Sequence, residues 1–321
     1  LLYYVCVYTQ IHLRSEKMGL KGLEENEVST VKVAMSNGGL FIIPLLVLSV
    51  ALVMGYSPTY VAAFASLSVI AVAAIKPSTR MGLKSIWEAL GETTLRMVSV
   101  TAACAAAGLV IGGISMTGLG GKFADLVFML AGNSSILVLI ISAILAIILG
   151  MGMPTPSAFI LAAVLVGPTL SSLDFSAMQS NMFILYFAVL SAMTPPVAVA
   201  AFAASAIADA KPLGISVGAV KLAITAFVVP FAFMYGEGLL LEGPITGIVL
   251  NCLTATLGVI VLSAGIEGYW KAPLSGIAQA MLLVAGLMFL APSIIALGIA
   301  VALVVAAVIS TPHLRSRAKI A

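Results

Sequence analysis

Long uninterrupted apolar runs constrain the fold of this chain more than any other feature. Runs of roughly 18–25 apolar residues recur along the sequence, which is the length that an α-helix needs to cross the hydrocarbon core of a bilayer. Only 8% of the residues are charged, whereas a soluble domain carries about a quarter. The apolar–polar alternation of an outer-membrane barrel strand is absent. The sequence therefore predicts an all-α polytopic membrane protein.

Charged residues avoid the centres of these runs. All twelve acidic residues lie in loops or near the ends of predicted spans. Because a proton pump places ionisable groups within its spans, proton coupling through a buried carboxylate is disfavoured. The net charge is only +3 and the basic residues lie in loops, so no nucleic-acid partner is expected. Cys6, Cys104 and Cys252 lie far apart in apolar surroundings, which favours small buried side chains over a metal site or a disulfide framework.

Composition divides the chain into four regions. The first combines the end of a helix with a polar extramembrane loop from Arg14 to Lys32. The second holds scaffold-type spans and an interfacial helix, the third is a transport-type region with a hairpin and two broken helices, and the fourth holds C-terminal spans. The predicted boundaries are 1–38, 39–96, 97–210 and 211–321. The opening Leu1 and the lack of a signal-peptide pattern indicate the C-terminal part of a longer polypeptide.

The second region begins with two closely spaced spans. They cover roughly 39–55 and 58–75, and Pro58 is placed to begin the second helix. The next segment, KPSTRMGLKSIWEALGETTLR, fits an amphipathic helix in the membrane interface, with an ordinary polar loop as the alternative. Its apolar face comprises Met81, Ile86, Trp87 and Leu90.

The fourth region is more uniform. Its predicted spans are 214–235, 244–265, 274–291 and 293–310. The basic tail HLRSRAK, together with Lys76, Arg80 and Lys84, indicates cytoplasmic ends because positive residues favour that side of a membrane.

The third region opens with an unusual concentration of glycine. Gly in a helix interior costs about 1 kcal/mol relative to Ala, and the apolar arm Phe123–Ala131 is too short to span a bilayer. A re-entrant helical hairpin over 97–132 explains both facts, since irregular backbone at membrane depth must be surrounded by protein or water. A plain loop after an ordinary span is the alternative. The glycines are Gly112, Gly113, Gly118, Gly120 and Gly121.

Two further apolar segments are broken by proline. GMGMPTPS (150–157) interrupts one run and SAMTPPVAVA (191–200) interrupts the next. Proline lacks a backbone N–H and clashes with the carbonyl one turn earlier. Such interrupted segments are the best sequence indication of a transporter binding site. The predicted breaks are at Pro154, Pro156, Pro195 and Pro196.

A cation can be held at such breaks without any carboxylate, because unwound helices release backbone carbonyls and Ser or Thr hydroxyls complete the shell. The candidate cation ligands are Gly150, Gly152, Ser191, Thr194 and Val197. Half-helices that begin near Thr155 and Val197 would offer N–H groups to an anionic substrate. The candidate substrate contacts are Ser115, Thr117, Thr155 and Ser157. Purely structural kinks, with Thr capping freed carbonyls, are the alternative.

The segments GMGMPTPSAFILAAVLVGPTL and NMFILYFAVLSAMTPPVAVAAFAASAIADAKP resemble the large membrane subunit of tripartite ATP-independent periplasmic (TRAP) transporters. CAAAGLVIGGISMTGLG and HLRSEKMGLKGL are similar to the type in which small and large membrane subunits are fused. The resemblance covers most of residues 1–240. It implies a multi-pass bacterial inner-membrane transporter that uses an elevator motion and half of an inverted repeat. It also implies import of a small organic anion, usually a carboxylate, which a periplasmic binding protein delivers. It further implies Na⁺ as the coupling ion, no other cofactor, and membrane lipid around the chain.

The resemblance also assigns residues. The family places Na⁺ at a Gly-x-x-Thr-Pro-Pro motif, which Thr194, Pro195 and Pro196 preserve, while Ser191 stands where the family often has Gly. A backbone carbonyl survives that change. The GMGMPT run carries over as Gly150, Gly152, Pro154 and Thr155. Without the first half of the repeat, these 321 residues alone are not expected to transport.

Three other functions are considered. A binding-protein-independent elevator-type anion/Na⁺ symporter would use similar broken helices. An intramembrane enzyme needs a nucleophile–base pair or buried aspartates, and neither is visible. A channel fits poorly because the broken helices converge on one point and no ring of charge is present. No arginine clamp for a carboxylate is visible either, since Arg96 lies at a span end and fits an interface anchor better.

Overall fold

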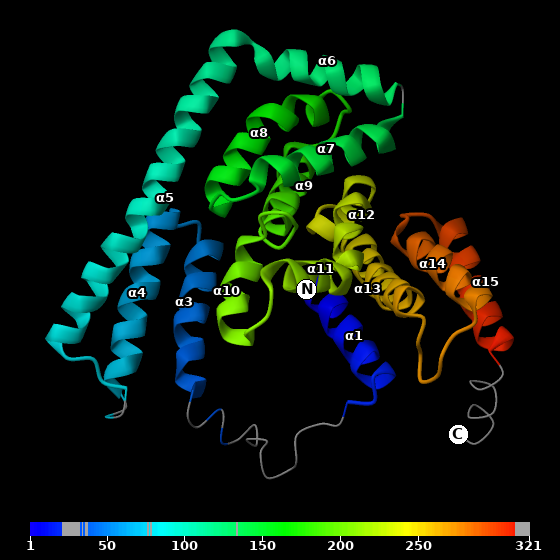
Figure 1. The fold of residues 1–321 in the computed structure, drawn as a ribbon, viewed down its shortest axis with the longest axis horizontal. Coiled ribbons are helices and arrows are strands. Elements are labelled where there is room, and N and C mark those ends of the chain that lie inside the picture. Colours follow the sequence, from blue (N-terminus) through cyan, green and yellow to red (C-terminus); the bar gives the residue numbers. More distant parts are fainter. Residues whose placement is uncertain are drawn as a thin grey trace. The chain divides into compact units, whose positions relative to one another are not determined.

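The computed structural model describes residues 1–20, 33, 35, 38–75, 77, 79–132 and 134–311. Within these residues every regular element is a helix (Figure 1), as predicted. The first helix, α1 (Leu2–Lys17), extends through the beginning of the predicted polar loop. The rest of that loop, residues 21–32, lies outside the described residues, as do Lys76 and the basic tail 313–319.

The chain forms two compact units. One comprises Lys21–Thr101, and the other comprises Leu1–Leu20 together with Ala102–Ala321. The first unit contains η1 (Gly39–Phe41), α3 (Ile42–Val53) and α4 (Pro58–Ile75). α3 and α4 pack against each other across a short turn, and Pro58 begins α4 as the sequence predicted.

A single helix replaces the separate elements expected over 76–113. α5 (Leu83–Thr117) is continuous for 35 residues and crosses the boundary between the units. No proline lies within it, and charged side chains one turn apart support its N-terminal part. Lys84 lies 3.8 Å from Glu88, and Arg96 lies 2.6 Å from Glu92. The segment 83–96 is therefore the beginning of α5 rather than an independent interfacial helix or a polar loop.

Gly118 alone separates α5 from α6 (Leu119–Ala131). Its φ of 64° lies in the left-handed region that glycine adopts without a steric penalty. The irregular segment is thus much shorter than the sequence predicted, since the other four glycines of this stretch are helical. They are Gly112, Gly113, Gly120 and Gly121.

Packing explains one of these helical glycines. A Cβ at Gly120 would lie 3.2 Å from the carbonyl oxygen of Val164 in α8. α6 packs on α8 and α7, so the small residue lets the helices approach closely. Packing against two further helices therefore accounts for a helical glycine that local propensity disfavours.

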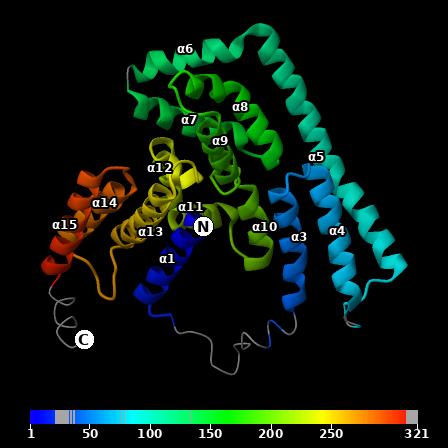
Figure 2. The same cartoon turned by 180° about the vertical axis from the view of Figure 1, so that it is seen from behind.

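α7 (Ser135–Gly150) and α8 (Thr155–Ser171) form an antiparallel hairpin (Figures 1 and 2). Val138 near the start of α7 shares an apolar cluster with Leu173, just beyond the end of α8. The prediction of one long span broken in its middle was therefore wrong at this position. The connection reverses the chain, because Gly152 has a φ of 77° while the flanking backbone is extended.

α9 (Ala177–Ser191) packs against both helices of this hairpin. A capping box begins it, since the Ser176 hydroxyl accepts from the backbone N–H of Gln179 and the Gln179 side chain accepts from the Ser176 N–H. Phe183 and Phe187 of α9 are fully buried, and their rings contact Phe231 with centroids 5.5 and 5.8 Å apart. These contacts form the centre of the largest apolar core.

The span predicted over 214–235 is also broken. α11 (Pro212–Leu222) and α12 (Val229–Tyr235) meet at η2 (Ile224–Phe227) and are bent by 65°. Pro230 lacks the N–H that a continuous helix would bond to the carbonyl of Ala226, and its ring would clash with that carbonyl. α1 supports the bend, because the Gln10 amide donates to the Thr225 hydroxyl at 2.9 Å.

The C-terminal helices follow the predicted spans closely. They are α13 (Ile245–Glu267), α14 (Gly276–Leu290) and α15 (Ile294–Ser310), preceded by η3 (Glu237–Leu240). α13 and α14 approach through Gly258 and Gly286, and a Cβ at Gly258 would lie 3.0 Å from the Gly286 carbonyl. Such close contact through small residues is typical of helices packed in membranes.

Length and apolar composition make three described helices, α4, α5 and α13, able to cross a membrane individually. The bent α11–α12 pair raises this number to four, and several shorter apolar helices accompany them. The protein is therefore a multi-pass membrane protein. The shorter helices are consistent with interrupted segments, although their depth in the bilayer remains a prediction.

Candidate ion and substrate site

The two proline-containing segments meet in the structure. A Cβ added to Gly150, the last residue of α7, would lie 2.9 Å from the Cβ of Ser191, the last residue of α9, and closer still to its Oγ. A Cβ on Gly152 would lie 3.3 Å from Cγ1 of Val197. The hairpin turn Met151–Pro154 therefore packs against the loop Ala192–Ala198, and glycine makes this contact possible.

The hairpin turn presents backbone oxygens. Thr155 begins α8, and Pro156 occupies its first turn, where a missing N–H costs nothing. Within the described chain, no N–H or hydroxyl donates to the carbonyl oxygens of Met151, Gly152 or Met153. These oxygens are free to bind a cation or water.

The second loop is unwound over seven residues. α9 ends at Ser191, and α10 (Val199–Ala208) begins two residues later than the predicted Val197. The backbone N–H of Ala200 donates to the Ala192 carbonyl at 2.9 Å and closes the loop. Among described residues, nothing donates to the carbonyls of Met193, Pro195 and Pro196. The loop thus also exposes uncommitted oxygens.

Both candidate hydroxyls, Ser191 at the end of α9 and Thr194 in the loop, contact the preceding helical turn. The Ser191 hydroxyl donates to the Ala188 carbonyl at 2.6 Å, and the Thr194 hydroxyl donates to the Leu190 carbonyl at 2.8 Å. Thr194 therefore caps a backbone carbonyl at the end of α9, as the purely structural alternative requires. Each oxygen still carries lone pairs that can bind a cation, so capping and coordination are compatible.

Ser157 faces inward from the first turn of α8. It is fully buried, and its Oγ lies 3.2 Å from the Sγ of Cys104 in α5. From the sequence alone, Cys104 is expected to be only a small buried side chain. No local motif marks its position, because its contact with Ser157 joins two helices that are distant in the sequence.

Ser115 and Thr117 lie elsewhere. Both are exposed at the C-terminal end of α5, and the Thr117 hydroxyl donates to the Gly113 carbonyl at 2.8 Å. At a helical rise of 1.5 Å per residue, Ser115 is roughly 16 Å along the axis from Cys104. No contact in the described structure joins either residue to the two loops, and their role in substrate binding remains a prediction.

The site is uncharged in its own side chains. Neither loop contains an ionisable residue, and the described residues contain no group of three His, Cys, Asp or Glu side chains that could hold a metal ion. A cation bound here would therefore be surrounded by neutral carbonyl and hydroxyl oxygens. The beginning of α8 adds N–H groups that favour negative charge.

Comparison with protein families gives one match. Residues 1–248 match the tripartite ATP-independent periplasmic transporter, DctM component. Both loops of the site lie within the matched part, whereas α14, α15 and most of α13 lie beyond it. Searches of curated proteins and of solved structures returned no match to the chain.

Proposed function

This chain belongs to the DctM component family of tripartite ATP-independent periplasmic transporters, and we propose that it binds Na⁺ and a small organic anion where the α7–α8 turn meets the loop after α9. It is thus a membrane component of a transporter rather than an enzyme. In this proposal the Na⁺ gradient drives import of the anion across the bacterial inner membrane, and Na⁺ is the only cofactor.

The observation that carries the proposal is the contact of two unwound segments far apart in sequence. Gly150 abuts Ser191, and Gly152 abuts Val197. Carbonyls from both segments have no donor in the described chain. Neutral oxygens suit a weakly bound monovalent cation, because carboxylates would bind it more tightly and attract divalent ions. The proposed Na⁺ ligands are therefore these carbonyls, with the hydroxyls of Ser191 and Thr194.

The anion is proposed to lie at the beginning of α8. Thr155 and Ser157 occupy the first turn, where N–H groups and the helix dipole favour a carboxylate. A bound Na⁺ nearby would add positive charge, so each ligand would raise the affinity for the other. This arrangement couples the two without an arginine clamp.

Two further features come from the family. We propose that a periplasmic binding protein delivers the anion and that α7–α10 move as an elevator. Uptake of a labelled dicarboxylate into proteoliposomes that contain the full-length protein tests both the coupling and the delivery. We expect uptake only with an inward Na⁺ gradient and the binding protein. Uptake without Na⁺ would overturn the coupling, and Na⁺-driven uptake without the binding protein would favour a symporter of the independent kind.

A further inference from the structure

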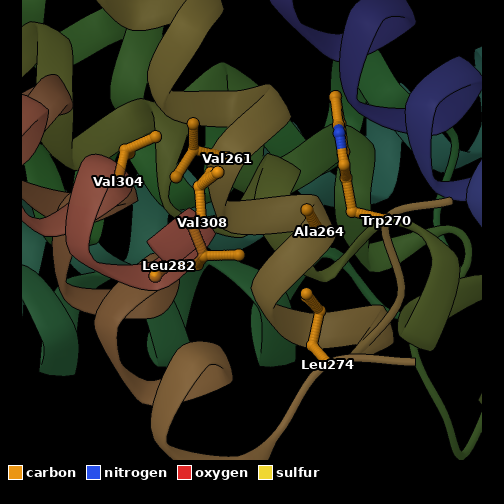
Figure 3. Close-up of a pocket in the computed structure, with 8 residues that line it drawn as sticks. Val261, Ala264, Trp270, Leu274, Leu282, Val304 and Val308 are labelled. Atoms are coloured by element: carbon orange, nitrogen blue, oxygen red, sulfur yellow. The ribbon is translucent and has the colours of Figure 1, made fainter. Parts of the chain in front are cut away.

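The C-terminal helices, beyond the part that matches the family, enclose an apolar cavity of about 250 Å³ (Figure 3). Val261 and Ala264 of α13, Leu282 of α14, and Val304 and Val308 of α15 line it, and Trp270 from the α13–α14 loop completes one side. Almost all of the lining atoms are carbon. The cavity therefore suits a hydrocarbon chain and excludes a free anion.

A second cavity, of about 190 Å³, also borders Trp270. Its lining is mostly apolar too, but it includes ionisable side chains, and α1 contributes to it. Thr9, His12 and Glu16 of α1 and Lys271 of the α13–α14 loop contribute polar groups to its lining. Because Trp270 lines both cavities, an apolar cavity and a cavity bordered by ionisable side chains adjoin at one aromatic side chain.

Among the described residues around this second cavity, one cation has no partner. Arg14 lies 3.9 Å from the carboxylate of Glu267, and the Lys17 ammonium donates to the Glu267 carbonyl at 2.5 Å. His12 lies 3.5 Å from Glu16. Lys271 is exposed and has no hydrogen bond or ion pair among the described residues, and the indole N–H of Trp270 has no acceptor there either. Both groups are available to bind an anionic oxygen.

We propose that these adjoining cavities bind an anionic glycerophospholipid. One acyl chain occupies the apolar cavity, and the phosphate binds the Lys271 ammonium and the Trp270 indole N–H. Tryptophan and lysine are suited to this boundary, since each combines an apolar body with a polar end at headgroup level. A neutral lipid would leave the charge of Lys271 unmatched, and a soluble phosphate would leave the apolar cavity unused.

The site also has the orientation expected for such a lipid. Arg14, Lys17 and Lys271 gather at the same end of α1 and α13. Positive residues favour the cytoplasmic side, where anionic lipids attract them. The lipid would bridge α1 to the C-terminal helices, and the proposal is independent of the ion and substrate site.

Quenching of Trp270 fluorescence by brominated lipids tests this site. The full-length protein, with every tryptophan except Trp270 replaced by Phe, is placed in phosphatidylcholine nanodiscs. Increasing fractions of the lipid are replaced by phosphatidylglycerol or phosphatidylcholine that carries dibrominated acyl chains. We expect half-maximal quenching at a mole fraction of brominated phosphatidylglycerol about five-fold lower than for brominated phosphatidylcholine, the preference that one lysine near a lipid headgroup provides.

Lys271→Asn identifies the headgroup contact. Asparagine removes the charge and tolerates the left-handed backbone at this position, where φ is 56°. We expect this variant to lose the preference for phosphatidylglycerol, whereas Lys84→Ala, which removes an exposed lysine of α5, should retain it. Equal quenching by the two lipids in the parent protein would overturn the proposal. So would a preference that survives in Lys271→Asn, or a Trp270 that neither lipid quenches because protein covers it.

Discussion

At the scale of single residues, Gly150 is the position where the smallest change should have the largest effect. A methyl group there would overlap the side chain of Ser191, and overpacking of this kind costs about 1–3 kcal/mol. We expect Gly150→Ala to push the hairpin turn away from the α9 loop. Since about 1.4 kcal/mol corresponds to a factor of ten, Na⁺-driven uptake by the full-length protein should fall by roughly that factor.

A second substitution makes this prediction specific. Ser191→Gly removes the atoms that the new methyl group would meet. Gly150→Ala combined with Ser191→Gly should therefore recover much of the uptake at saturating Na⁺, although loss of the Ser191 hydroxyl should raise the half-saturating Na⁺ concentration. Gly167→Ala is the matched control, because a Cβ at that helical glycine meets nothing within 4 Å. A Gly150→Ala protein with normal uptake would show that the two loops need not touch.

Thr194 distinguishes ion binding from helix capping. Its hydroxyl donates to the Leu190 carbonyl and is also proposed to bind Na⁺. If the oxygen coordinates Na⁺, Thr194→Ala should raise the half-saturating Na⁺ concentration for uptake roughly five-fold, as expected for the loss of one polar contact of about 1 kcal/mol. Thr194→Ser keeps the oxygen and should remain close to the parent. An unchanged Na⁺ dependence in Thr194→Ala would leave capping as the only role of this hydroxyl.

At the scale of elements, the limits of helices that begin or end at a marked Pro or Gly could be predicted. The direction in which the chain continues after a break could not. α4 follows an apolar run that begins at Pro58, and α13 follows an apolar run that ends at Gly268. These two helix limits could therefore be seen in the sequence. GMGMPT marks a break equally well whether the chain continues or reverses. The reversal into an α7–α8 hairpin depends on packing against α6 and α9, which local sequence does not encode.

The same distinction applies to the candidate site. Prolines and glycines located both loops in advance, because their backbone chemistry is local. Cys104 could not be found in this way, since its contact with Ser157 joins helices separated by fifty-three positions. Ser115, a candidate substrate contact, lies on the same continuous helix α5 but roughly 16 Å along its axis from Cys104.

The α13–α14 contact gives a prediction at this scale. A Cβ at Gly286 would lie 2.7 Å from Cβ and 2.8 Å from Cα of Leu262, and a helix backbone cannot move aside cheaply. We expect Gly286→Ala to destabilise the protein by about 1–3 kcal/mol, visible as a lower midpoint of thermal unfolding in detergent. Gly298→Ala in α15, where a Cβ meets nothing within 4 Å, is the control and should not lower the midpoint. Equal midpoints for the two variants would contradict the close packing of α13 and α14.

At the scale of the whole molecule, the proposed elevator motion carries the loops around Gly150 and Ser191 across the membrane. The protein carries no ionisable residue in either loop, so moving this region through the bilayer involves no bare side-chain charge. In the proposed mechanism, neutral ligands around Na⁺ would shield its charge during the movement, and the co-transported anion would balance it. An elevator motion of α7–α10 is therefore physically reasonable for this site.

Val197 provides a test of that movement, because it lies on the loop after α9 and its side chain is 38% exposed. In a full-length protein whose native cysteines have been replaced, Val197→Cys should react with a membrane-impermeant maleimide from either side of oriented vesicles, since an elevator exposes the loop alternately. Ser293→Cys, in the α14–α15 turn outside the proposed moving part, should react from one side only. Saturating Na⁺ should slow labelling of Val197→Cys, because ion binding orders the two loops against each other. Labelling of Val197→Cys from a single side under every Na⁺ and substrate condition would contradict the elevator motion and place the site in a fixed part of the protein.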